Sequence, residues 1–172
     1  SEATLSAIRG EGKLFAARRP PWYMERRREL EALARSIFVE KGGMPRTEYP
    51  HYFTLGRCDW LESWFESPRL LCLELDAIAP GAISFSYGDL FPSFSPAVSD
   101  GREYRRQIYT LGEITELVGR YGLPQDWNAD GSRGPERYIE VEVWLDAESI
   151  LSRSEPGLIG RSCRSEEHTS EL

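Results

Sequence analysis

The sequence predicts a single α+β domain with a mostly antiparallel mixed sheet and about three helices. A length of 172 residues suits one domain that buries a sizeable core. Residues 139–143, within the segment 137–145, alternate strictly between apolar and polar side chains, which is typical of a strand. Segments with helical and with strand spacing follow one another without an internal repeat, and this order favours an α+β domain.

Residues 137–145 form the strand around which we expect the fold to be organised. Alternation places two opposite rows of side chains on its faces. One row is Ile139, Val141, Val143 and Leu145, and the other is Tyr138, Glu140, Glu142 and Trp144. The aliphatic row predicts sheet core. The other row carries two carboxylates roughly 7 Å apart between two aromatic rings, which indicates either a cleft or a half-exposed strand with a polar outer face.

Two long segments have helical spacing. The first opens at Pro20-Pro21, and Gly42-Gly43 end it. The second starts from a capping box of Thr110 and Glu113 and ends at Gly122. A shorter helix is expected over residues 59–65.

Several shorter segments read as strands. They cover residues 51–55, 70–75, 82–87 and 104–109. The loop over residues 88–101 contains two phenylalanines and is expected either to tuck against the body or to form a flap.

Composition excludes some classes of function. A net charge of −7 argues against binding nucleic acid by phosphate neutralisation alone, although local contact with nucleic acid stays open. The three cysteines have no metal-type or paired spacing, which suits a reducing, cytoplasmic compartment. His51 is the single histidine of the body, so we expect no metal site. No apolar run is long enough to span a membrane.

The two ends differ from the body in composition. Residues 1–19 read as a loose lead-in, residues 20–151 as the single domain, and residues 152–172 as a disordered or artefactual tail. Residues 164–172 resemble a translated sequencing-library adapter. We therefore expect a sequence assembled from environmental reads, whose true C-terminus has been lost.

Paired carboxylates are the chemistry that the residues favour. There is no Gly-x-Ser-x-Gly turn for a nucleophile and no glycine-rich phosphate loop before a helix. Glu140 and Glu142 lie on one strand face, so they do not straddle a glycosidic bond from opposite sides.

Three short pieces of the chain carry a resemblance. They are His51 ahead of the helix over 59–65, Phe85 or Tyr87 on a middle strand, and the Glu140-x-Glu142 pattern on a late strand. Together they resemble the ADP-ribosyltransferase fold, in the branch of DarT-type toxins and tRNA 2'-phosphotransferases. The resemblance implies NAD as co-substrate, no metal, and a nucleic-acid or protein acceptor.

The same resemblance implies roles for individual residues. Glu142 would be catalytic, because a fixed carboxylate stabilises the positive charge that develops on the ribose, and Glu140 would position the acceptor. His51, Thr54 and Arg46 would bind the cofactor, and Phe85 or Tyr87 would stack near the nicotinamide.

Structural roles and a different class of protein stay open beside these assignments. His51 also fits a core or turn histidine, Phe85 and Tyr87 fit the core, and Arg46 fits a surface loop. The alternative function is a non-enzymatic protein-interaction module, since many of the five Trp, seven Phe and eight Tyr lie in loops. The distinguishing geometry is whether His51, an aromatic ring and the glutamates line one pocket.

Overall fold

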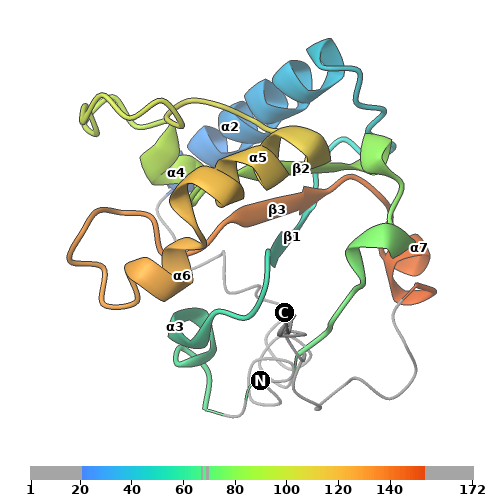
Figure 1. Ribbon diagram of the computed structural model, residues 1–172. Coiled ribbons are helices and arrows are strands. Elements are labelled where there is room, and N and C mark those ends of the chain that lie inside the picture. Colours follow the sequence, from blue (N-terminus) through green and yellow to red (C-terminus); the bar gives the residue numbers. More distant parts are fainter. Residues whose placement is uncertain (1–20, 67, 69, 154–172) are drawn as a thin grey trace, which may run out of the picture.

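The computed structural model describes residues 21–66, 68 and 70–153 (Figure 1). The described elements are α2 (Pro21–Glu40), β1 (His51–Thr54), α3 (Asp59–Glu62), β2 (Ile83–Ser86), α4 (Leu90–Ser93), α5 (Leu111–Tyr121), α6 (Pro124–Trp127), β3 (Glu140–Val143) and α7 (Ala147–Leu151). Two short 3-10 helices, Leu75–Ala77 and Pro80–Ala82, precede β2. The predicted α+β fold is confirmed. The predicted lead-in, and the tail from residue 154 onwards, lie outside the described residues.

The sheet has three antiparallel strands in the order β1-β3-β2. The strand predicted to organise the fold is therefore the central one. Its aliphatic side chains Ile139, Val141 and Val143 are between 0% and 4% exposed, which confirms their prediction as core.

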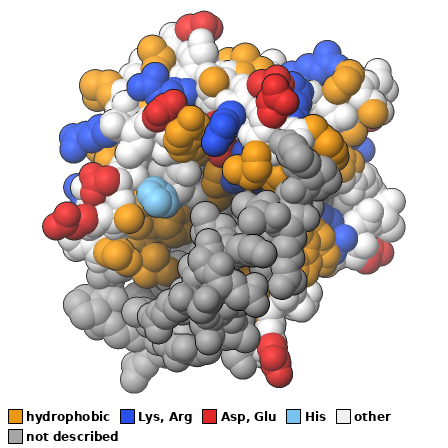
Figure 2. Space-filling model, turned by 180° about the vertical axis from the view of Figure 1, so that it is seen from behind, with side chains coloured by type: hydrophobic (Ala, Val, Ile, Leu, Met, Phe, Trp, Pro, Cys, Tyr) orange, Lys and Arg blue, Asp and Glu red, His pale blue; other side chains and the backbone are white. Residues whose placement is uncertain are grey.

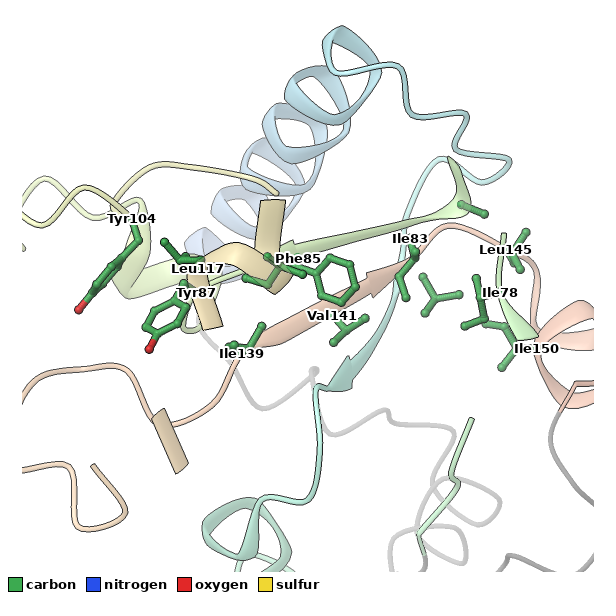
Figure 3. Packing of buried hydrophobic residues seen from close by; sticks show 13 residues of the cluster. Ile78, Ile83, Phe85, Tyr87, Tyr104, Leu117, Ile139, Val141, Leu145 and Ile150 are labelled. Carbon is green, nitrogen blue, oxygen red and sulfur yellow. The ribbon is translucent and has the colours of Figure 1, made fainter. Parts of the chain in front are cut away.

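Helices cover both faces of the sheet (Figure 1). On the aliphatic face, α5 packs against β2, and Ile114 and Leu117 join the strand residues in one apolar cluster (Figure 3). On the opposite face, α2 and α4 supply a second apolar cluster that includes Trp144 of the central strand's extension. The Trp144 ring stacks on that of Phe38 at 6.5 Å between centroids.

The two long helices form as their sequences predict. In α5, the Thr110 side chain accepts from the Glu113 amide, and the Glu113 carboxylate accepts from the Thr110 amide, so the capping box is complete. Gly122 ends this helix at a φ of 73°.

The exposed side of α2 carries ion pairs such as Arg26–Glu29. Lys, Arg, Asp and Glu side chains intermingle over the upper part of the face shown in Figure 2, and hydrophobic side chains gather below them.

Three segments differ from their predictions. Residues 70–75 have no strand partner among the described residues, and 104–109 contribute only an isolated bridge between Tyr109 and Phe85. The helix α7 was not predicted, because its five residues fall at the predicted boundary of the tail. The loop over 88–101, by contrast, takes one of the two arrangements predicted for it: it is tucked against the body, since Leu90 and Phe94 are buried in the α2 cluster.

Two findings bear on the setting of the chain. None of the described helices is long and apolar enough to cross a membrane. Cys58 is a buried free thiol.

Candidate functional site

The strand register decides which predicted site residues share a face. Tyr52 pairs with Glu142 and Thr54 with Glu140, so these four side chains lie on the polar face of the sheet. His51 pairs with Val143 and therefore lies on the aliphatic face. The sheet itself separates His51 from both glutamates.

The aromatic candidates lie on the same side of the sheet as His51. Phe85 pairs with Val141, and Tyr87 follows two residues later with the same facing. Both are 0% exposed within the apolar cluster, where the Tyr87 hydroxyl donates to the Gly122 carbonyl at 2.8 Å (Figure 3). These rings are core residues and form no wall beside the glutamates.

The remaining candidates do not assemble a pocket around His51. His51 and Arg46 are exposed at the surface. The Thr54 hydroxyl donates to the Gly56 carbonyl at 2.7 Å, which is a local turn contact. The expectation that His51, Phe85 or Tyr87, and a glutamate line one pocket is therefore wrong, because alternation along β1, β2 and β3 sends them to opposite faces.

Glu142 is completely buried beneath α2. Trp144 Nε1 donates to Ser84 Oγ at 2.8 Å, and Ser84 Oγ in turn donates to Glu142 Oε2 at 2.7 Å. The other oxygen, Oε1, has no hydrogen-bond partner. Burial raises the pKa of Glu142 to about 8, against an ordinary value of 4.5. The carboxyl group is therefore held mainly protonated at neutral pH.

Glu140 is also buried, 8% exposed, at the end of the sheet near α4. The Leu90 amide donates to one oxygen at 3.3 Å, and the Tyr138 hydroxyl approaches the other at 3.5 Å. Burial raises the pKa of Glu140 well above its ordinary value, and the charge of Asp89 adds to the effect.

A second network joins α2 to β1 on the same face. The Tyr52 hydroxyl and Arg27 Nε both donate to Glu31 Oε1 at 2.9 Å. The Arg27 guanidinium also lies over the Tyr52 ring, 4.3 Å from its centroid. The polar face is thus a hydrogen-bonded internal layer. It is neither of the two arrangements that the sequence indicated, a cleft or a half-exposed surface.

In the described part of the chain, no group of three or more His, Cys, Asp or Glu residues is placed to hold a metal.

An open hollow lies on the other face of the sheet. We call it the apolar groove: a space of about 430 Å³ between the sheet, α3 and the extended segment 70–75. Val141, Val143 and Ile83 form its floor. Its walls, among the described residues, include Phe53, Leu55, Leu61, Phe65, Leu71 and Leu73.

The rim of the apolar groove is polar. Arg57 Nε lies 2.8 Å from a Glu62 oxygen and 2.9 Å from an Asp59 oxygen, so its charge is matched locally. Glu74 is exposed on the opposite wall and forms no ion pair with a described residue. An apolar floor with a net acidic rim suits a hydrophobic ligand that carries a basic group.

The groove residues were missed as a site in the sequence. The sequence predicts a strand over residues 70–75 and assigns no binding role to its leucines. The available signal was the run of leucines followed by a Pro-Gly turn. Periodicity in a sequence does not show, however, that segment 70–75 leaves a space between itself and α3.

The geometry defines a class of site, an apolar groove beside a sheet. The carboxyl groups of Glu140 and Glu142 lie buried on the opposite face of the sheet. Comparisons with protein-family models, curated proteins and solved structures found no match for this chain.

Proposed function

We propose that this protein is a non-enzymatic interaction module that binds an apolar segment of a partner protein in the groove. The apolar groove is the single observation that carries the proposal. Its volume of about 430 Å³ accommodates several aliphatic side chains, and its floor is the aliphatic face of the central strand.

Burial of partner side chains would supply the binding free energy. Each fully buried Leu, Val or Phe contributes about 1.5–3 kcal/mol, so several anchors are needed to offset the about 4–15 kcal/mol lost on association. Exposed aromatic rings near α3, Trp64 at 58% and Phe65 at 45%, extend the apolar surface beyond the groove. Large exposed apolar side chains next to a hollow are typical of interaction surfaces.

The transferase hypothesis stays a prediction that this geometry does not favour. It requires His51 and Glu142 to face one ribose, and the register sends their side chains to opposite faces of the sheet. An assay for NAD-dependent transfer of labelled ADP-ribose, compared with Glu142→Gln, tests it directly.

A library of peptides of about seven residues, apolar at alternate positions, tests the interaction module. Selected peptides are measured by fluorescence anisotropy against the unmodified chain, Leu71→Glu and Leu33→Glu. Leu71 lines the groove, whereas Leu33 is a 44% exposed leucine on α2 and serves as the matched control.

We expect the Leu71→Glu substitution to weaken binding by at least about tenfold, because one lost apolar anchor is worth at least 1.4 kcal/mol. The Leu33→Glu control should bind as the unmodified chain does. Far-UV circular dichroism and a melting curve verify that both variants are folded. Failure to enrich any peptide, or equal binding by Leu71→Glu, would refute the proposal.

A further inference from the structure

The two edges of the sheet differ in the described structure. Beyond β2, the Phe85 amide donates to the Tyr109 carbonyl at 2.9 Å, and the Tyr109 amide donates back at 2.8 Å. Beyond β1, the described residues contain no further strand. Within the described residues, the edge of β1 that faces away from β3 is therefore the edge without a strand partner, and we call it the open edge.

The hydrogen-bond pattern identifies which groups lie on that open edge. The Leu55 amide donates to the Ile139 carbonyl at 3.0 Å, which makes Leu55 a residue that faces β3. In an antiparallel pair, every second residue faces the partner strand, so Phe53 and His51 face β3 as well. The amides and carbonyls of Tyr52 and Thr54 consequently point away from the sheet.

The other side of β3 gives an independent check of this assignment. The Trp144 amide donates to the Ala82 carbonyl at 2.9 Å, so Trp144 and, by alternation, Glu142 and Glu140 face β2. The intervening Val141 and Val143 must then face β1, opposite Phe53 and His51.

No described group bonds to the outward backbone of Tyr52 or Thr54. Unpaired amides and carbonyls in a row accept an extended polypeptide as a further strand. The four-residue β1 contains no Lys, Pro or bulge, so the device among those that protect natural edges that it does have is its short length, with Pro50 directly before it.

The open edge and the apolar groove adjoin each other. Phe53, Thr54 and Leu55 belong to β1 or follow it directly, and all three line the groove. A strand paired with Tyr52 and Thr54 would send every second side chain to the aliphatic face, beside these groove residues. The acidic charge of Glu74 on the rim complements a basic residue at the end of such a segment.

We infer that the partner segment binds by adding a strand to the open edge of β1, with alternate apolar side chains entering the groove. The segment is extended, apolar at every second residue and flanked by Lys or Arg. This inference rests on the proposed function and specifies its mode of recognition.

The probe is a Lys-flanked peptide from the alternately apolar library, prepared in two N-methylated forms. One form is methylated on the amides that would face β1, and the other on the amides that would face solvent. Methylation removes a donor and blocks pairing only on the edge that it modifies. We expect at least tenfold weaker binding for the first form and less than threefold change for the second.

A substitution in the protein provides the complementary test. Thr54→Pro removes an outward amide that the sheet does not use, and Pro is tolerated at such edge positions. We expect this variant to melt near the unmodified chain and to bind the peptide at least tenfold more weakly. If Thr54→Pro does not fold, the pair of methylated peptides on the unmodified chain still decides the question.

The possible outcomes separate the two proposals. Equal binding by both methylated forms, with loss of binding in Leu71→Glu, would overturn strand addition and leave groove binding intact. No binding of any peptide would overturn both. A peptide flanked by Glu that binds as tightly as its Lys-flanked counterpart would overturn the charge preference. Concentration-dependent dimers that mask the edge would assign it to a second copy of the chain, contrary to the inference.

Discussion

Both faces of the sheet are buried, but they are covered by different kinds of partner. The row containing Glu142, Ser84 and Trp144 is 0% exposed beneath α2 and α4. The aliphatic row is core, as predicted, and two of its members, Val141 and Val143, also line the floor of the apolar groove. Polarity alone therefore does not predict which face of a strand is buried, because protonation and hydrogen bonding allow carboxyl groups to be covered.

The difference has a physical basis in the partners that each face provides. Trp144, Ser84 and Glu142 form a chain of donated hydrogen bonds, which offsets much of the desolvation of the buried polar groups. The floor of the groove presents no comparable donors, so it is complementary to apolar groups alone. The predictions below test this contrast, beginning with the largest expected effect.

Val141→Asp should abolish cooperative folding. Val141 is 4% exposed in the central strand and faces the apolar cluster, so an aspartate there would be an unpaired buried charge. Such a charge costs at least about 3–5 kcal/mol, a large fraction of the stability of a small domain. Circular dichroism during heating is the measurement, with Val141→Ala as a control that removes volume without charge. A soluble Val141→Asp variant that melts cooperatively would contradict the claim that the aliphatic face cannot accommodate a buried charge.

Glu142→Gln should remove much of the pH dependence of stability. The folded carboxyl group keeps its proton up to a pKa of about 8, whereas the unfolded one releases it near 4.5. The folded state then binds more protons between these values, so the free energy of unfolding falls as pH rises from about 4.5 to about 8. The total loss is on the order of a few kcal/mol.

Glutamine keeps the shape of Glu142 and can accept from Ser84 but does not ionise, so we expect Glu142→Gln to be the more stable form near pH 8.5. Urea denaturation at pH 5.5, 7 and 8.5 measures the difference. Glu113→Gln is a useful control, because hydrogen bonding to Thr110 and Lys41 lowers the pKa of this surface carboxyl despite some desolvation. If the free energy of unfolding depends on pH in the same way for the unmodified chain and Glu142→Gln, then Glu142 is not protonated in the folded state above its ordinary pKa.

Ser84→Ala should destabilise the protein by about 1–3 kcal/mol, because it leaves Trp144 Nε1 without an acceptor and Glu142 without its donor. The same change should raise the pKa of Glu142 further, since the Ser84 hydrogen bond lowers it. Chemical denaturation at two pH values measures both effects. Ser149→Ala, at an exposed helix cap, gives a reference for loss of a hydroxyl outside the core.

Local sequence signals predicted the elements well and the site poorly. The capping box at Thr110, the glycine at 122 and the alternation over 137–145 are local features, and the corresponding helix and strand form as predicted. The site depended on long-range register. Alternation showed that Glu142 faces away from Val143, but only the pairing of Val143 with His51 excludes a shared pocket. No periodicity within β1 carries that information.

Leu73→Ala should have the smallest effect and gives the finest test of the groove as a partly open site. Leu73 lines the groove and is only partly buried, so truncation removes contacts without sealing a cavity inside the core. We expect a loss of about 1 kcal/mol or less, against about 2–5 kcal/mol for Leu117→Ala, whose side chain is 1% exposed on the buried side of α5. Chemical denaturation of both variants measures the ratio. Equal losses would mean that segment 70–75 is closed core in solution, and the groove would then have no room for a partner.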